Sequence, residues 1–145
     1  FPEGYILYGP GPVMNYRPED RPAIRTRDGF LEVTDDPEQP KFGIDSYDGW
    51  LAYITRDDMV FIKRFPASPD WLYGEMASFT ISLWYYKDSM CELEPIGPWE
   101  TIPPDNCASF SEDWWLLPYE YPQDKSVDLD AFTEYIDTNA PADQQ

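Results

Sequence analysis

Apolar and polar residues alternate with a period of two along much of this chain, which is the pattern of half-buried β-strands. The pattern predicts strands at residues 23–34, 41–44, 50–54, 59–65, 78–86, 90–94 and 109–115. Residues 59–65 are apolar almost without interruption, which favours a strand buried on both faces. The chain is therefore predicted to be mostly β.

The connections between these stretches carry turn signals. Asp48-Gly49 stands between two β-rich runs and predicts a hairpin. Residues 56–58 predict a second turn. A Gly- and Pro-rich segment, residues 95–104, separates two alternating stretches, which we interpret as antiparallel strands joined by a long connection.

The two ends of the chain differ from its middle. Residues 1–22 are rich in Pro and Gly and predict an extended arm with one apolar run, Tyr5-Ile6-Leu7-Tyr8. Residues 126–136 have apolar positions at helical spacing after a Ser or Asp cap, and predict one short helix. We expect an antiparallel β-sandwich domain with this C-terminal helix at residues 23–137, followed by a polar tail at 138–145.

Length and charge narrow the classes of function. A chain of 145 residues has the size of one domain, and no apolar run approaches the length of a membrane span. The formal net charge of −18 repels phosphate backbones and anionic lipid surfaces, so nucleic acid and membrane insertion are not expected. The first residue is Phe1 rather than Met, which fits a processed, exported product or a fragment.

The chain has two cysteines and no histidine. Cys91 and Cys107 flank the long connection, and across a hairpin they would form a disulfide, which would also agree with export. Two buried thiols are the alternative. Zinc is not expected without histidine. The acidic pairs at 35–36 and 57–58, with Asp128 and Asp130, have the oxygen ligands of calcium sites, but turns and helix caps explain them more simply. We expect neither metal nor cofactor.

Aromatic residues make up 17% of the chain. Because flat rings stack on sugar rings, the candidates for carbohydrate binding are Trp71, Trp84, Tyr86 and Trp99. The alternative is that these rings fill the core or a subunit interface, where Tyr and Trp are also enriched.

An ordered set of short motifs adds to this picture. It comprises Lys41-Phe42-Gly43, Gly49-Trp50-Leu51-Ala52-Tyr53, Phe61-Ile62-Lys63-Arg64-Phe65, Glu92-Leu93-Glu94 with Pro95 and the turn after it, and Asp128-Leu129-Asp130-Ala131. In order and spacing, from about residue 21 to 136, the set resembles a bacterial branch of the galactose-mutarotase-like supersandwich family. Each motif is weak alone, and the ordered set is more specific.

The resemblance covers only the C-terminal half of a supersandwich. It identifies Glu94 as the position of the catalytic carboxylate in a mutarotase. That chemistry also requires an acid, which is a histidine in the family, and this chain has none. The resemblance therefore implies a related fold without epimerase activity, with Glu94 as the residual catalytic candidate.

Half of such a fold leaves strand edges and apolar faces to be covered. Our leading hypothesis from the sequence is a non-catalytic, extracellular or cell-surface subunit that self-associates. Tyr5, Ile6, Leu7 and Tyr8 would add a strand to a neighbouring copy, and an exchange that does not close would give a filament. The alternative hypothesis is a carbohydrate-binding module or an inactive remnant of a sugar-active protein.

Overall fold

A computed structural model describes residues 5–8, 23–35, 41–75, 78–86 and 89–142. Within these ranges the chain forms antiparallel sheets and one helix, consistent with the mostly β, sandwich-type fold and the C-terminal helix that the pattern predicts. The chain divides into two compact units. Unit 1 consists of residues 1–47 and 67–108, and unit 2 of residues 48–66 and 109–145.

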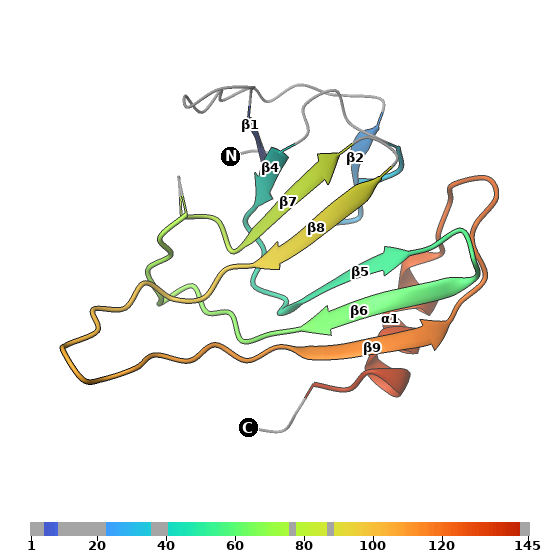
Figure 1. The fold of residues 1–145 in the computed structure, drawn as a ribbon. Coiled ribbons are helices and arrows are strands. Elements are labelled where there is room, and N and C mark those ends of the chain that lie inside the picture. Colours follow the sequence, from blue (N-terminus) through green and yellow to red (C-terminus); the bar gives the residue numbers. More distant parts are fainter. Residues whose placement is uncertain (1–4, 9–22, 36–40, 76–77, 87–88, 143–145) are drawn as a thin grey trace. The chain divides into compact units, whose positions relative to one another are not determined.

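The main sheet of unit 1 has four strands in the order β1-β4-β7-β8, with every neighbouring pair antiparallel (Figure 1). Its strands are β1 (Tyr5–Tyr8), β4 (Lys41–Ile44), β7 (Ile81–Tyr86) and β8 (Met90–Pro95). Ile81 and Leu83 of β7 are buried, as is Phe79 just before the strand. These side chains form much of the apolar core of unit 1.

The first strand pairs within its own chain. β1 lies antiparallel to β4, with Tyr5 opposite Ile44 and Tyr8 opposite Lys41. This pairing covers β4, which would otherwise be an edge strand with unpaired backbone groups. The addition of Tyr5, Ile6, Leu7 and Tyr8 to the sheet of another copy stays a prediction, because the structure describes a single chain. The remainder of the predicted arm lies outside the described residues.

The predicted strand at residues 23–34 is a hairpin. It consists of β2 (Ile24–Arg27) and β3 (Phe30–Val33). Asp28 and Gly29 both have positive φ, 51° and 86°, as the two central residues of a tight hairpin turn require. Glu32 accepts hydrogen bonds from both Arg25 and Arg27, which closes the hairpin with two ion pairs.

Unit 2 has a three-stranded sheet in the order β5-β6-β9 and a helix packed on one face (Figure 1). The elements are β5 (Trp50–Ile54), β6 (Met59–Arg64), β9 (Asp113–Pro118) and α1 (Leu129–Asn139). The turn predicted at residues 56–58 is present, because Thr55 N donates to the carbonyl of Met59 at 2.7 Å.

The core of unit 2 lies between the sheet and α1. Val60, Ile62 and Ile136 are fully buried there, and Phe132 and Ala140 complete the cluster. The opposite face of the sheet is more open to solvent. On that face, Trp114 and Leu116 of β9 are 64% and 62% exposed.

The helix is fixed at both ends by side chains. Asp128 is its N-cap and accepts a hydrogen bond from Ala131 N at 3.1 Å, as the sequence predicts. Arg64 lies at the other end, donating to the carbonyl of Ala140 at 2.9 Å and to Asp137 at 2.7 Å. A cation at this position is favourable because the helix C-terminus carries partial negative charge.

Two predicted hairpins are wrong. Asp48-Gly49 does not join paired strands, since β4 pairs with β1 and β7 whereas β5 pairs with β6. The strands on either side of residues 95–104 also do not pair: β8 pairs with β7, and β9 pairs with β6. In both places the chain passes from one unit to the other.

The predicted disulfide is also wrong. Cys91 lies on β8 and Cys107 is exposed in the connection that follows, and both are thiols. Since β8 and β9 are not partners, the connection does not bring the two cysteines face to face across a hairpin. The disulfide therefore no longer supports export.

Candidate functional site

Three segments of unit 1 meet at one end of the β1-β4-β7-β8 sheet. Ile44 ends β4 and lies opposite Ile81, the first residue of β7, which in turn lies opposite Pro95, the last residue of β8. The described residues of the segments at this end are 45–47, 67–75 with 78–80, and 96–108. They are the loops from which a binding site can be built on this unit.

These loops are fastened to one another. The hydroxyl of Thr80 accepts a hydrogen bond from Ser46 N at 2.8 Å and donates to the carbonyl of Ser46 at 2.6 Å. Tyr73 forms an isolated β-bridge with Pro98, and Trp99 N donates to the carbonyl of Leu72 at 2.6 Å. Hydrogen bonds therefore join the three segments into one supporting structure, so they are not independent loops.

The support carries four aromatic rings, Tyr47, Trp71, Tyr73 and Trp99, which we call the aromatic platform. Tyr73 is at its centre and is only 4% exposed. Its ring centroid lies 6.3 Å from that of Tyr47 and 6.4 Å from that of Trp71. Its hydroxyl accepts from Ser68 N at 2.9 Å and donates to the carbonyl of Ser68 at 3.1 Å.

The other three rings are open to solvent. Trp99 is 69% exposed, and Tyr47 and Trp71 are 40% and 38% exposed. Trp99 lies against the backbone of Gly74, where an added Cβ would be 3.5 Å from the indole Cε3. Leu72, which is 76% exposed, extends the apolar surface. Exposed apolar groups gathered in this way on a folded unit are characteristic of binding surfaces.

Two of the four carbohydrate candidates are thus brought to one place, and two lie elsewhere. Trp71 and Trp99 belong to the aromatic platform. Trp84 and Tyr86 are on β7, and by strand alternation Trp84 shares a face of the sheet with Glu94. The side chain of Tyr86 lies outside the described part of the chain. Trp84 is half-buried.

Sequence reasoning missed Tyr47 and Tyr73. Both are Tyr residues in short loops without a periodic pattern, and nothing in their local sequence separates an exposed ring from a central one. One sequence feature could have pointed to Tyr73. It lies two residues after Trp71 in a Pro-containing loop, and this short separation limits how far apart the two rings can lie.

The residual catalytic candidate, Glu94, is in an ion pair. It lies on β8 and accepts a hydrogen bond from Lys41 of β4. Partial burial raises the pKa of Glu94, but the hydrogen bond and the charge of Lys41 outweigh this and hold the pKa below its ordinary value. Glu92, two residues earlier on the same face, has a raised pKa, first because it hydrogen-bonds to Glu94. The two carboxyl groups therefore interact directly with each other.

Two of the acidic residues considered for calcium have structural roles. Asp128 caps α1, and Asp58, which has a φ of 57°, accepts a hydrogen bond from Tyr121 N at 2.9 Å. Asp36 lies outside the described residues. Among the residues that the structure describes, no group of three or more Asp, Glu, Cys or His side chains has the arrangement of a metal site.

Lys63 and Arg64, the adjacent basic pair on β6, are both engaged within unit 2. Lys63 forms an ion pair with Glu112 at 3.0 Å and lies 4.7 Å from the centre of the Trp114 ring. Arg64 binds the end of α1. These contacts give the pair a structural role.

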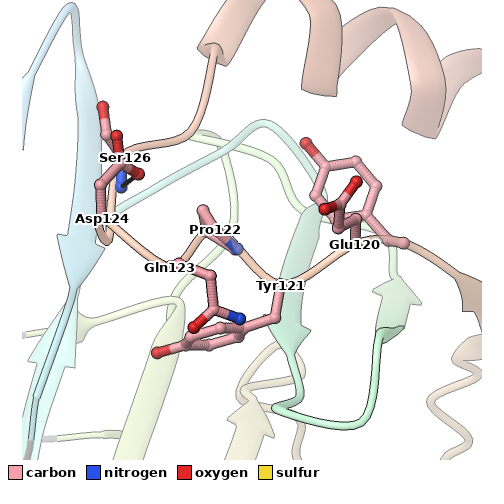
Figure 2. Close-up of a pocket in the computed structure, with 7 residues that line it drawn as sticks. Glu120, Tyr121, Pro122, Gln123, Asp124 and Ser126 are labelled. Atoms are coloured by element: carbon pink, nitrogen blue, oxygen red, sulfur yellow. Dashed lines mark hydrogen bonds between the residues drawn. The ribbon is translucent and has the colours of Figure 1, made fainter.

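Unit 2 has an open hollow of about 520 Å³ in the loop between β9 and α1. All of its lining residues come from this one loop, residues 119–126 (Figure 2). The loop is held by its own hydrogen bonds, including Ser126 N to Asp124 at 3.0 Å and Lys125 N to the carbonyl of Pro122 at 2.8 Å. Groups from other elements do not converge on it, so we do not assign a ligand to it.

Within the described part of the chain, the helix is too short and too polar to traverse a bilayer. No protein-family model, curated protein or solved structure matches this chain.

Proposed function

We propose that this protein is a non-catalytic carbohydrate-binding protein that acts outside the cell or at its surface, and that the aromatic platform of unit 1 is its binding site. The observation that carries the proposal is the group of three exposed rings, Tyr47, Trp71 and Trp99, held on loops tied to one end of a sheet. The resemblance to mutarotase-like proteins adds to the same proposal.

The energetics favour a ligand over simple exposure. Full burial of a large apolar side chain contributes about 1.5–3 kcal/mol, and Trp99 and Leu72, which are 69% and 76% exposed, forgo most of that contribution. A sugar ring offers both a flat apolar face for stacking and hydroxyl groups at its edge. The hydroxyls are hydrogen-bond donors, which suits a protein with an excess of carboxylate acceptors.

Replacing Trp99 or Trp71 by Ala should weaken oligosaccharide binding by about tenfold, because a stacked aromatic contact contributes roughly 0.5–1.5 kcal/mol beyond the area it buries. Isothermal titration calorimetry with a panel of soluble oligosaccharides measures this. The fold should persist, since the backbone hydrogen bond of Trp99 does not depend on its side chain.

The matched control is Trp114→Ala in unit 2, because Trp114 is exposed to a similar extent, 64% against 69% for Trp99. Its replacement should leave the dissociation constant within about twofold. Equal loss of binding in the Trp114 and Trp99 variants, or a panel that does not bind at all, would refute the proposal.

The proposal includes the absence of mutarotase catalysis. The reaction needs a base and an acid acting at different atoms of the sugar, whereas Glu94 is paired with Lys41 and the chain has no histidine to serve as the acid. We expect no acceleration of glucose or galactose mutarotation in polarimetry. Acceleration that disappears in Glu94→Gln would establish the enzyme instead.

Self-association through β1 is the second candidate function. The observation that favours it is that β1 is a four-residue edge strand joined to β2 by residues 9–23, a connection of ample length for strand exchange. The backbone pairing that β1 makes with its own β4 is available between two copies as well, which is the basis of domain swapping.

Deletion of residues 1–16 tests this candidate. Light scattering after size exclusion should find concentration-dependent oligomers or filaments for the whole chain and monomers for the truncated one, with β-sheet circular dichroism preserved. Identical assembly states for both chains would eliminate β1 as the connector.

A further inference from the structure

The surroundings of the aromatic platform are acidic at each exposed ring. Asp70 immediately precedes Trp71, Glu100 immediately follows Trp99, and both carboxylates are exposed. Asp45 lies two residues before Tyr47 and is exposed as well. Every exposed ring of the platform therefore has a carboxylate within two residues along the chain.

The basic residues of unit 1 that the structure describes do not offset this charge. Between Phe65 and Trp114 the sequence has a single basic residue, Lys87, which lies outside the described residues. The basic residues of unit 1 that the structure describes are engaged elsewhere: Arg25 and Arg27 with Glu32, and Lys41 with Glu94. Within the described part of unit 1, the loops of the platform thus combine electron-rich rings with an excess of negative charge.

This combination selects a class of ligand. The face of a Trp or Tyr ring attracts a cation, and a neighbouring carboxylate adds to that attraction. We propose, on the basis of the proposed function, that the aromatic platform binds glycans containing amino sugars with free, protonated amines. The sugar faces stack on Trp71 and Trp99, while the ammonium groups lie near the rings and the carboxylates of Asp70 and Glu100.

The test compares three tetrasaccharides of equal length: one of glucosamine, one of N-acetylglucosamine and one of glucose. Calorimetry is carried out at about pH 6, where amines are protonated and carboxylates ionised. The glucosamine tetramer should bind about three- to tenfold more tightly than the other two, and high salt should reduce this advantage.

Two variants separate the site from general charge. The double variant Asp70→Asn with Glu100→Gln should abolish the preference for the glucosamine tetramer. The control is Asp130→Asn with Glu134→Gln, which removes two exposed carboxylates from α1 in unit 2 and should keep the preference. If the control variant loses the preference for the glucosamine tetramer to the same extent, net charge alone attracts the sugar and the inference is overturned.

The outcomes also distinguish this inference from the proposed function. Equal affinities for all three tetramers, lost in Trp99→Ala, would leave a carbohydrate-binding protein and overturn the ligand class. A tetralysine peptide provides a further comparison. If it binds more tightly than every tetramer and its binding also depends on Trp99, the partner is a basic protein, and the inference of an amino-sugar ligand is overturned. Absence of Trp99-dependent binding to any of the tetramers or the peptide would overturn both proposals.

Discussion

Gly49→Ala is expected to destabilise unit 2 by about 3 kcal/mol. Gly49 has a φ of +70°, a conformation that costs a residue with a Cβ about 1–2 kcal/mol. An added Cβ would also lie 2.8 Å from the carbonyl oxygen of Phe65, which is backbone and cannot turn away. Relief of that contact would strain the hydrogen bond from Phe65 N to the carbonyl of Gly49. Urea unfolding followed by circular dichroism measures the loss.

Gly29→Ala is the matched control, because Gly29 has a φ of +86° and no atom within 4 Å of its Cβ position. It should show the cost of the backbone conformation alone, about 1–2 kcal/mol, on the unfolding of unit 1. Equal losses in the two variants would mean that the contact with Phe65 is relieved without cost.

Ile136→Ala should have a comparable or larger effect, a loss of about 2–5 kcal/mol in the free energy of unfolding of unit 2. Ile136 is fully buried between α1 and the sheet, together with Val60, Ile62 and Phe132. Because one helix and three strands make up the described part of this unit, few other contacts compensate for the cavity. Differential scanning calorimetry or urea unfolding measures the change.

Leu116→Ala provides the comparison within the same unit. Leu116 has a side chain of similar size but is 62% exposed on the outward face of β9. Its replacement should cost about 0.5 kcal/mol or less. A loss as large as that of Ile136→Ala would indicate that the outward face of β9 is covered in solution.

The strands and the helix could be predicted from the sequence because their signals are local. Alternation identifies β7 and β8, short apolar runs identify β5 and β6, and helical spacing after a Ser or Asp cap identifies α1, all without knowledge of their neighbours. The pairing of the strands is not local. Asp28-Gly29 and Asp48-Gly49 are the same dipeptide, yet the first closes a hairpin and the second leads from unit 1 into unit 2. Distant strands decide between the two outcomes.

The arrangement of the aromatic platform also depends on long-range contacts that the local sequence does not reveal. Trp71 and Trp99 could be selected as flat, stackable residues, but their meeting depends on the β-bridge between Tyr73 and Pro98 and on the hydrogen bond between Trp99 and Leu72. These contacts join residues more than 20 positions apart. The aromatic content of the chain therefore supplied candidate residues, whereas the arrangement of the rings required the tertiary structure.

The order of the two units along the chain has a consequence for biosynthesis. The β5–β6 hairpin is made early, but its sheet partner β9 and the helix that covers Val60 and Ile62 follow only after the rest of unit 1 has been synthesised. Domains generally fold from the N-terminus as the ribosome releases them. Unit 1 can thus fold around an unfinished insertion, while the apolar face of that hairpin stays uncovered until α1 emerges. The nascent chain is therefore most exposed to aggregation during the synthesis of residues 67–139.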